Sequence, residues 1–218
     1  MSINVRFERN GKFVSVDDAQ NCPILVSGGG RSFDPDLVTT FDTEGAYRTW
    51  ARHSPNREQF LRLDLMIAHV QQHEKPDDDA EMMKTHRRRT ERLRADFDAL
   101  RARLGAKATF VDTFRVASLD AHLLEGPILD SMTLHQHADL AGKWVPIWNK
   151  APIPKLSWLD FNDRTTSVLI SGIGVLTQHS WFRGRRFYLA GFPLFEYSNL
   201  ADRGFNNMAS SAAVQGAD

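Results

Sequence analysis

The sequence has a single cysteine, no excess of either charge and no long apolar run, and each shortage excludes a class of protein. Its 218 residues include 27 basic and 27 acidic side chains. This balance removes the simplest case for nucleic-acid binding, which needs an excess of lysine and arginine. Cys22 stands alone, so an intrachain disulfide is impossible and a reducing compartment is indicated. No stretch approaches the ~20 apolar residues that span a bilayer.

The N-terminal residues show no pattern of a secretion signal. Residues 1–15 alternate polar and apolar side chains instead of joining a basic stretch to an apolar one. We therefore expect a cytoplasmic protein without a membrane partner, unless a signal-less export system carries it. The length is sufficient for one large or two small domains.

The first residues predict a β-hairpin. Apolar and polar residues alternate from Ile3 to Asn10-Gly11, a dipeptide preferred in type I′ turns, and extended character resumes over residues 12–16. Residues 23–27 predict a further short strand. The following Gly28–Arg31 segment predicts a flexible turn, because it lacks the Gly-Lys-Ser/Thr ending of a phosphate-binding loop.

Helical signals follow the strands. Asp42 or Thr43 can cap a short helix that reaches Trp50, and Ser54-Pro55 is a helix start. Apolar residues at spacings of three and four then form two stripes: Phe60, Leu63, Ile67 and Val70, and Met83, Thr90, Leu93, Phe97, Leu100 and Leu104. We predict that residues 56–104 form an antiparallel helical hairpin whose stripes face each other or the N-terminal sheet. Residues 109–116 predict a strand.

Two polar features of these helices have alternative interpretations. The second helix carries Arg87, Arg88, Arg89, Arg92, Arg94, Arg101 and Arg103. They could meet nucleic acid or an acidic partner, but Glu91, Asp96 and Asp98 lie at helical pairing distances, which favours a solvated, salt-bridged face. His69 and His73 have a spacing that can bind zinc, but no third ligand is evident.

The rest of the chain is organised around a pattern that occurs twice between Ser131 and Val214. Residues 134–143 recur as residues 176–185, with Leu, Gln, His and Gly in register. Residues 156–168 recur as residues 200–212. Each unit has about forty residues of short β-type segments broken by Gly and Asn/Asp turns, which predicts one four-stranded Greek key per unit.

The two units end in similar hexapeptides, Asn162–Ser167 and Asn206–Ser211, of the form Asn/Asp-Asn/Asp-x-x-Ser/Thr-Ser. Each follows a hairpin with an apolar or aromatic residue two positions before a Gly. With these motifs the last 85 or so residues resemble a βγ-crystallin domain of the calcium-binding microbial type. The whole chain is then an α+β protein. A mixed domain over residues 1–125, with the β-hairpin and the helical hairpin, precedes a β-sandwich of two Greek keys over residues 126–218, which we expect to fold alone.

The resemblance implies up to two Ca²⁺ ions. The first site would use the carbonyls of Ala138 and Arg164 and the side chains of Thr166 and Asn207, and the second the carbonyls of Ser180 and Met208 and the side chains of Ser210 and Asp163. Ser167 and Ser211 would instead hold the folded hairpins. His135 and Thr177 stand where an aromatic residue is usual. Because Asp163 is the only acidic ligand, we expect dissociation constants on the order of 10⁻⁶ to 10⁻⁴ M.

We therefore expect a non-enzymatic calcium-binding protein, in which the ion stabilises the C-terminal domain and the N-terminal half offers a surface to a protein partner. An alternative is that the hexapeptides are turns only. A proteinase inhibitor or toxin-like effector on the same scaffold is also open, although the lack of cysteine pairs and of a secretion signal counts against it. A third alternative is an enzyme within residues 1–125, but no nucleophile elbow or triad spacing supports it.

Overall fold

The computed structural model describes residues 5–28, 34–73, 79–119 and 131–216. The helices are α1 (Val16–Gln20), α2 (Glu44–His53), α3 (Arg57–Gln72), α4 (Asp79–Leu104) and α5 (Phe110–Leu119). The strands are β1 (Arg6–Arg9), β2 (Lys12–Val14), β3 (Ile24–Ser27), β4 (Leu37–Phe41), β5 (Ser131–His135), β6 (Trp144–Trp148), β7 (Ser167–His179), β8 (Arg183–Tyr197) and β9 (Ser211–Gln215). No helix of the described residues is long and apolar enough to cross a bilayer.

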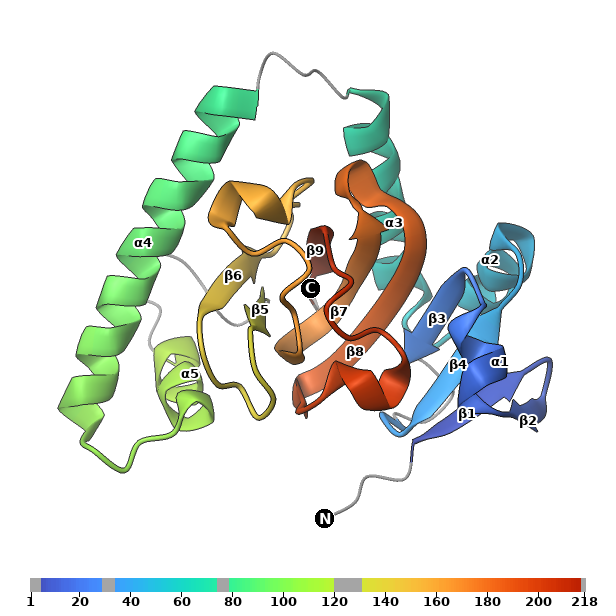
Figure 1. The fold of residues 1–218 in the computed structure, drawn as a ribbon, viewed down its shortest axis with the longest axis horizontal. Coiled ribbons are helices and arrows are strands. Elements are labelled where there is room, and N and C mark those ends of the chain that lie inside the picture. The colour runs from blue at the N-terminus through green and yellow to red at the C-terminus, as the bar shows by residue number, and fades with distance from the viewer. Residues whose placement is uncertain (1–4, 29–33, 74–78, 120–130, 217–218) are drawn as a thin grey trace.

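The nine described strands are joined by hydrogen bonds into one sheet, and the long strands β7 and β8 divide its part in the second half of the chain into two layers (Figure 1). The first half of β7 pairs with β5, and its second half pairs with β9, with a register shift between Ile170 and Gly172. We call the layer of β6, β5 and the adjoining halves of β7 and β8 the β5 sheet. The layer that contains β9 and the other halves is the β9 sheet.

The two sequence repeats fold as interlocked Greek keys. The first comprises β5, β6, residues 149–153 and the start of β7, and its third segment crosses to the β9 sheet through a bridge between Ile153 and Ala212. In the second repeat the end of β8 crosses back, since Tyr197 pairs with Val168 of the β5 sheet. This exchange of third segments confirms the predicted pair of Greek keys.

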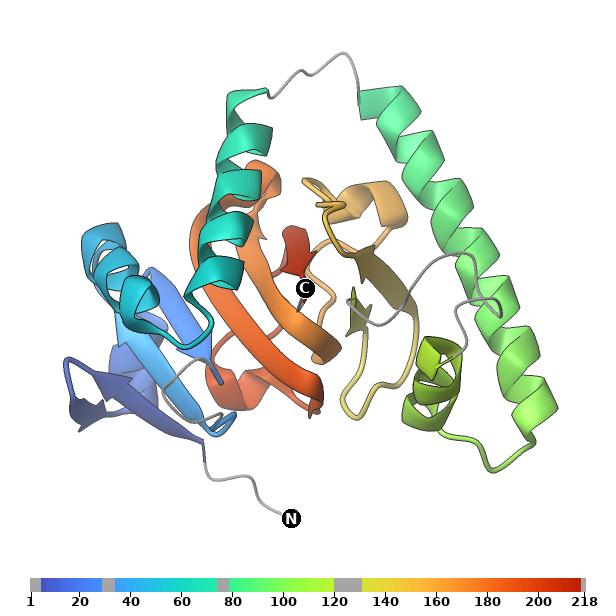
Figure 2. The ribbon, with the colours of Figure 1, turned by 180° about the vertical axis from the view of Figure 1, so that it is seen from behind.

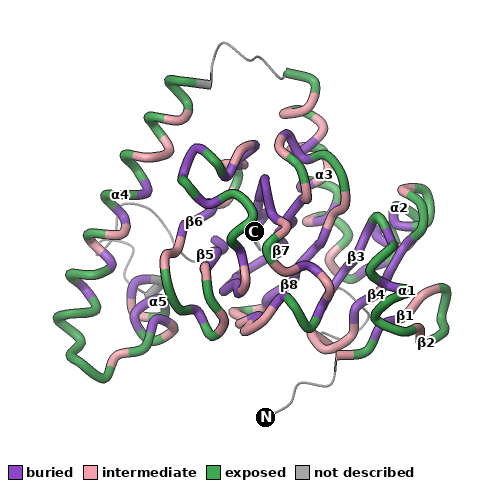
Figure 3. Tube along the Cα trace, viewed as in Figure 1, coloured by how far each residue is buried: buried purple, intermediate pink, exposed green. Residues whose placement is uncertain are grey.

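Both sheets are buried on both faces. Along β8, Phe187 and Leu189 point into the core between the sheets, whereas Tyr188 and Ala190 point outward into a second apolar cluster. Figure 3 shows burial along most of β7 and along the middle of β8. A strand covered on both sides needs no alternation of polar residues, which explains why apolar residues follow one another in residues 187–190 of β8.

Helices from the first half of the chain cover the outer faces. Helix α3 places Phe60, Leu63 and Ile67 on the β9 sheet, against Val175 and Tyr188. Helix α4 lies on the other side of the molecule, with α5, against the β5 sheet (Figure 2).

Of the two expected arrangements, the one in which the helical stripes face each other is therefore wrong, although both helices are present. The stripe of α3 does pack in one cluster with Ile24 and Val26 of the N-terminal strands. The stripe of α4, with Leu93, Phe97 and Leu100, contacts Leu169 and Trp148 instead of α3. The physical reason is that each sheet has an apolar outer face, and a helix that covers it buries more apolar area than a partner helix would.

The N-terminal strands extend the β9 sheet. The predicted hairpin is confirmed, with positive φ at Asn10 (52°) and Gly11 (75°) as its turn requires. Strand β3 pairs in parallel with β8, so β1 to β4 continue the β9 sheet across the expected division. The division itself, at residues 125–127, lies outside the described residues and stays a prediction, as does the turn at residues 29–31. That the second half folds alone likewise stays a prediction.

Helix capping explains why three other local predictions were wrong. Residues 110–116 are helical instead of extended, because Thr109 caps α5: the Asp112 N–H donates to Thr109 Oγ1 (3.1 Å) and the Thr109 N–H donates to the Asp112 carboxylate (3.1 Å). Residue 16 begins helix α1, since Ser15 caps it. The Ser54 hydroxyl accepts the Asn56 N–H (3.2 Å), so α3 begins only at Arg57.

Candidate functional site

The two repeats have the same backbone conformation at their turns. Residues with positive φ occur in matching pairs, namely Asp139 with Trp181, Leu140 with Phe182, Gly142 with Gly184, Asp160 with Gly204 and Asp163 with Asn207. Most of these residues are not glycine, and such a conformation is uncommon for them. The repeat in the sequence is therefore also a repeat in backbone conformation.

The last serine of each hexapeptide holds the folded hairpin of its own repeat. The Ser167 hydroxyl donates to the carbonyl of His137 (2.6 Å) and accepts the N–H of Leu140 (3.1 Å). The Ser211 hydroxyl repeats this pattern, donating to the carbonyl of His179 (2.9 Å) and accepting the N–H of Phe182 (3.0 Å). The predicted structural role of both serines is confirmed.

The hexapeptides also hold each other. The Asp163 N–H donates to the Ala209 carbonyl (2.9 Å), and the Asn207 N–H donates to the Thr165 carbonyl (3.0 Å). Because Ala209 and Thr165 occupy the same position in the two hexapeptides, the two hydrogen bonds are reciprocal. This contact brings the second residue of each loop beside the loop of the partner repeat.

The side-chain oxygens predicted for each site lie together. The Thr166 hydroxyl lies 3.1 Å from the amide oxygen of Asn207, and the Ser210 hydroxyl lies 3.1 Å from a carboxylate oxygen of Asp163. Neighbouring oxygens that ligate calcium at 2.3–2.6 Å are separated by roughly 2.8–3.4 Å. Both oxygen pairs therefore fit calcium in spacing and in chemistry.

The main-chain members of the predicted sets belong to the segments that border these oxygen pairs. In sequence, Arg164 lies between Asp163 and Thr166, and Met208 lies between Asn207 and Ser210. Arg164 is exposed and Met208 is half-buried. Ala138 and Ser180 are half-buried in the hairpins held by Ser167 and Ser211. The Ala138 carbonyl accepts the N–H of Ala141 (3.2 Å).

Histidine and cysteine offer no alternative metal centre in the described ranges. Three or more His, Cys, Asp or Glu side chains do not gather anywhere in these ranges. The ring centres of His69 and His73 lie 4.2 Å apart, and His73 Nδ1 is 2.8 Å from the carbonyl oxygen of His69. Any metal bound by the loops described above would therefore depend on neutral oxygens and Asp163, which suits a hard cation.

His135 occupies the hairpin position where an aromatic residue is usual. Its ring is fully buried, its Nε2 lies 3.0 Å from the Thr133 hydroxyl, and Phe110 and Trp144 pack on it. This burial lowers the pKa of His135 to about 3. The imidazole is thus a neutral core group. Thr177, its counterpart, is buried as well.

The arginines of α4 do not form only a solvated face. Arg87 donates to the carbonyl of Trp158 (2.6 Å) and pairs with Asp160 (3.0 Å). The Arg89 guanidinium lies 4.2 Å from the ring centre of Trp148. These contacts depend on where the helix docks, so the periodicity of the sequence held no signal for them.

The interlocked repeats form a double Greek-key domain in the C-terminal part of the chain. Solved structures similar to this part include a βγ-crystallin from Ciona intestinalis (22% identity, 39% of this chain, 99% of that chain, TM-score 0.35). A βγ-crystallin from an archaeon (22%, 38%, 95%, 0.34) and a domain from Flavobacterium johnsoniae (20%, 40%, 96%, 0.34) are also similar. No protein-family model and no curated protein matches the chain. The likeness concerns the fold of this part alone.

Proposed function

We propose that this chain is a non-enzymatic calcium-binding protein, whose double Greek key binds up to two Ca²⁺ ions between its repeats. The observation that supports the proposal is the pairing of oxygens across the repeats, Thr166 with Asn207 and Ser210 with Asp163, at 3.1 Å each. In the structure each pair is joined by a hydrogen bond that the Thr166 or Ser210 hydroxyl donates, and this bond holds the two oxygens at the spacing that a shared ion needs.

Each ion would join the two repeats. The carbonyls of Ala138 and Arg164 would complete the first site, and those of Ser180 and Met208 the second. Because an ion bound in this way prefers the folded state, it stabilises the protein by about 2.7 kcal/mol per site at one hundred times the dissociation constant. With one acidic side chain among the ligands, that constant is on the order of 10⁻⁶ to 10⁻⁴ M.

The N-terminal half would have two roles in this proposal. Its helices cover the outer faces of the sandwich, and its remaining surface is available to a protein partner.

The proposal is tested by thermal unfolding with calcium and with a chelator. A chain of this length gains about 2–4 °C per kcal/mol, so two filled sites should raise the melting temperature by roughly 10–20 °C. Asp163→Ala should lose much of the gain, and Asn207→Ala a smaller part because an amide carries no charge. Asp202→Ala, an exposed acidic residue outside the hexapeptides, is the matched control and should keep the full gain. Equal melting of the wild type with and without calcium would contradict calcium binding.

A further inference from the structure

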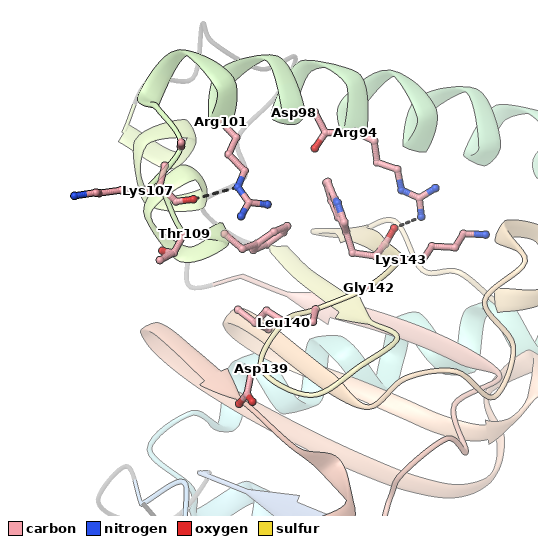
Figure 4. A pocket seen from close by; sticks show the side chains of 14 residues that line it. Arg94, Asp98, Arg101, Lys107, Thr109, Asp139, Leu140, Gly142 and Lys143 are labelled. Carbon is pink, nitrogen blue, oxygen red and sulfur yellow. Dashed lines mark hydrogen bonds between the residues drawn. The ribbon is translucent and has the colours of Figure 1, made fainter.

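A large cleft separates α4 from the first hairpin of the sandwich (Figure 4). Its volume is about 780 Å³, and its walls are α4, residues 106–110 and residues 139–144. Pockets for small molecules have volumes of about 300–1,000 Å³. The cleft is therefore large enough for a small organic molecule, and the predicted calcium ligands do not form it, since none of them lines it.

The charges of the cleft are mostly positive. The charged lining residues are Arg94, Arg101, Lys107 and Lys143, against Asp98 and Asp139. Four cations and two carboxylates give a local charge of +2 in a chain whose total formal charge is zero. A site of this kind attracts an anion.

Lys143 and Arg94 lie close enough at one end of the cleft to repel each other. Burial lowers the pKa of Lys143, and the nearby cations Arg94, Arg164 and Arg87 lower it further against the opposite effect of Asp160. Burial also lowers the pKa of Arg94, against the opposite effect of Glu91 and Asp98. A bound anion would relieve this repulsion.

Arg101 has free donors in the cleft. Its Nε donates to the carbonyl of Ala108 (3.1 Å), which fixes the guanidinium beside the start of α5. Figure 4 shows this side chain extending from α4 toward Thr109, whereas Lys107 points away. Its two terminal nitrogens have no partner among the residues that the structure describes. An arginine fork of this kind matches the oxygens of a phosphoryl group.

The start of α5 adds donors to the same end of the cleft. The Thr109 hydroxyl accepts the N–H of Asp112, which leaves the N–H groups of Phe110 and Val111 without a partner inside the helix. First-turn N–H groups and the helix dipole favour an oxyanion with several acceptor oxygens. The Asp112 carboxylate already accepts the N–H and the hydroxyl of Thr109 at this helix start, so an anion would have to share it with that carboxylate.

We propose that the cleft between α4 and residues 139–144 binds a small phosphorylated molecule, whose phosphoryl group is held by Arg101 and the start of α5. A phosphoryl group suits the site better than a carboxylate, because it carries up to two charges and three acceptor oxygens for the donors that converge there.

Calorimetric titration with inorganic pyrophosphate tests this proposal, in buffer freed of metals by a chelating resin. The wild type should bind one pyrophosphate per chain, and Arg101→Gln should weaken binding about tenfold or more, because it removes charge-assisted hydrogen bonds. Arg103→Gln is the matched control, since Arg103 is exposed on the same helix and does not line the cleft. It should change the affinity by less than about twofold.

Asp98→Asn provides an independent variant, since it leaves the Arg101 contacts intact. The exposed carboxylate of Asp98 repels an anion in the cleft, so its removal should tighten pyrophosphate binding several-fold. An absence of binding at millimolar pyrophosphate would overturn the proposal, as would equal weakening by Arg101→Gln and Arg103→Gln. Citrate binding as tightly as pyrophosphate would overturn the assignment of a phosphoryl ligand.

Discussion

Replacing His135 with phenylalanine should change how the stability of the protein depends on pH. The ring is fully buried, and burial lowers its folded pKa to about 3 from an ordinary value of 6.5. For a base with a depressed folded pKa, the unfolded chain takes up the proton first. The stabilisation is therefore complete above pH 6.5 and is lost as the pH falls toward 3.

The magnitude follows from the size of the shift. Each pH unit below 6.5 should cost about 1.4 kcal/mol through His135, which amounts to roughly 5 kcal/mol at pH 3. His135→Phe removes this contribution and also an imidazole nitrogen, Nδ1, that has no partner within the described residues. The loss of the Thr133 hydrogen bond lowers stability at every pH, so only the slope is diagnostic.

Urea unfolding between pH 7 and pH 4.5 measures that slope. The free energy of unfolding should fall less steeply for His135→Phe than for the wild type, by about 1.4 kcal/mol per pH unit. His53→Gln, at an exposed histidine of α2, should follow the wild type. Parallel curves for the wild type and His135→Phe would refute the reasoning, because the folded protein would then protonate His135 as readily as the unfolded chain.

Two further predictions concern the helices. Leu93→Ala or Phe97→Ala should lower the free energy of unfolding by roughly 2–5 kcal/mol, because both residues are buried against the β5 sheet. Urea unfolding measures this change, and Leu104→Ala, at an exposed site, is the control. A change within about 0.5 kcal/mol for Leu93→Ala would mean that α4 does not dock there. Burial raises the pKa of Asp64, whose carboxylate accepts the Tyr188 hydroxyl (2.6 Å). Its protonated form is therefore favoured in the fold, and the stability that this provides is lost as the pH rises through the raised pKa. Asp64→Asn should flatten that loss when the same assay is run from pH 4 upward, and an unchanged pH dependence would contradict the assignment.

The sequence predicted those features of the fold that short local patterns determine. The N-terminal hairpin followed from Asn10-Gly11, and the Greek keys followed from two loops with a fixed order of small polar residues. These features depend on turn chemistry that each short segment carries by itself. That Asp163 would lie near Ser210 was implied by the resemblance to βγ-crystallins and not by a local pattern; the two side-chain oxygens lie 3.1 Å apart.

Such local patterns could not predict how the helices are arranged. An apolar stripe shows that α3 and α4 bury one face, but the partner is chosen by the apolar outer faces of two distant sheets, such as Tyr188 on one and Trp148 on the other. The parallel pairing of β3 with β8 and the cleft beside Arg101 depend on that arrangement. Periodicity cannot report contacts between segments so far apart in the chain.

The sharing of calcium between the two repeats is the central claim, and counting bound ions in two double variants tests it most directly. In Asp163→Ala/Ser210→Ala both changes fall in the same proposed site, so calorimetry should still find one calcium ion per chain. In Asp163→Ala/Thr166→Ala the changes fall in different sites, and binding of both ions should be weakened or lost. The opposite result, with one ion retained by Asp163→Ala/Thr166→Ala and none by Asp163→Ala/Ser210→Ala, would show that each hexapeptide binds calcium by itself and would contradict the account.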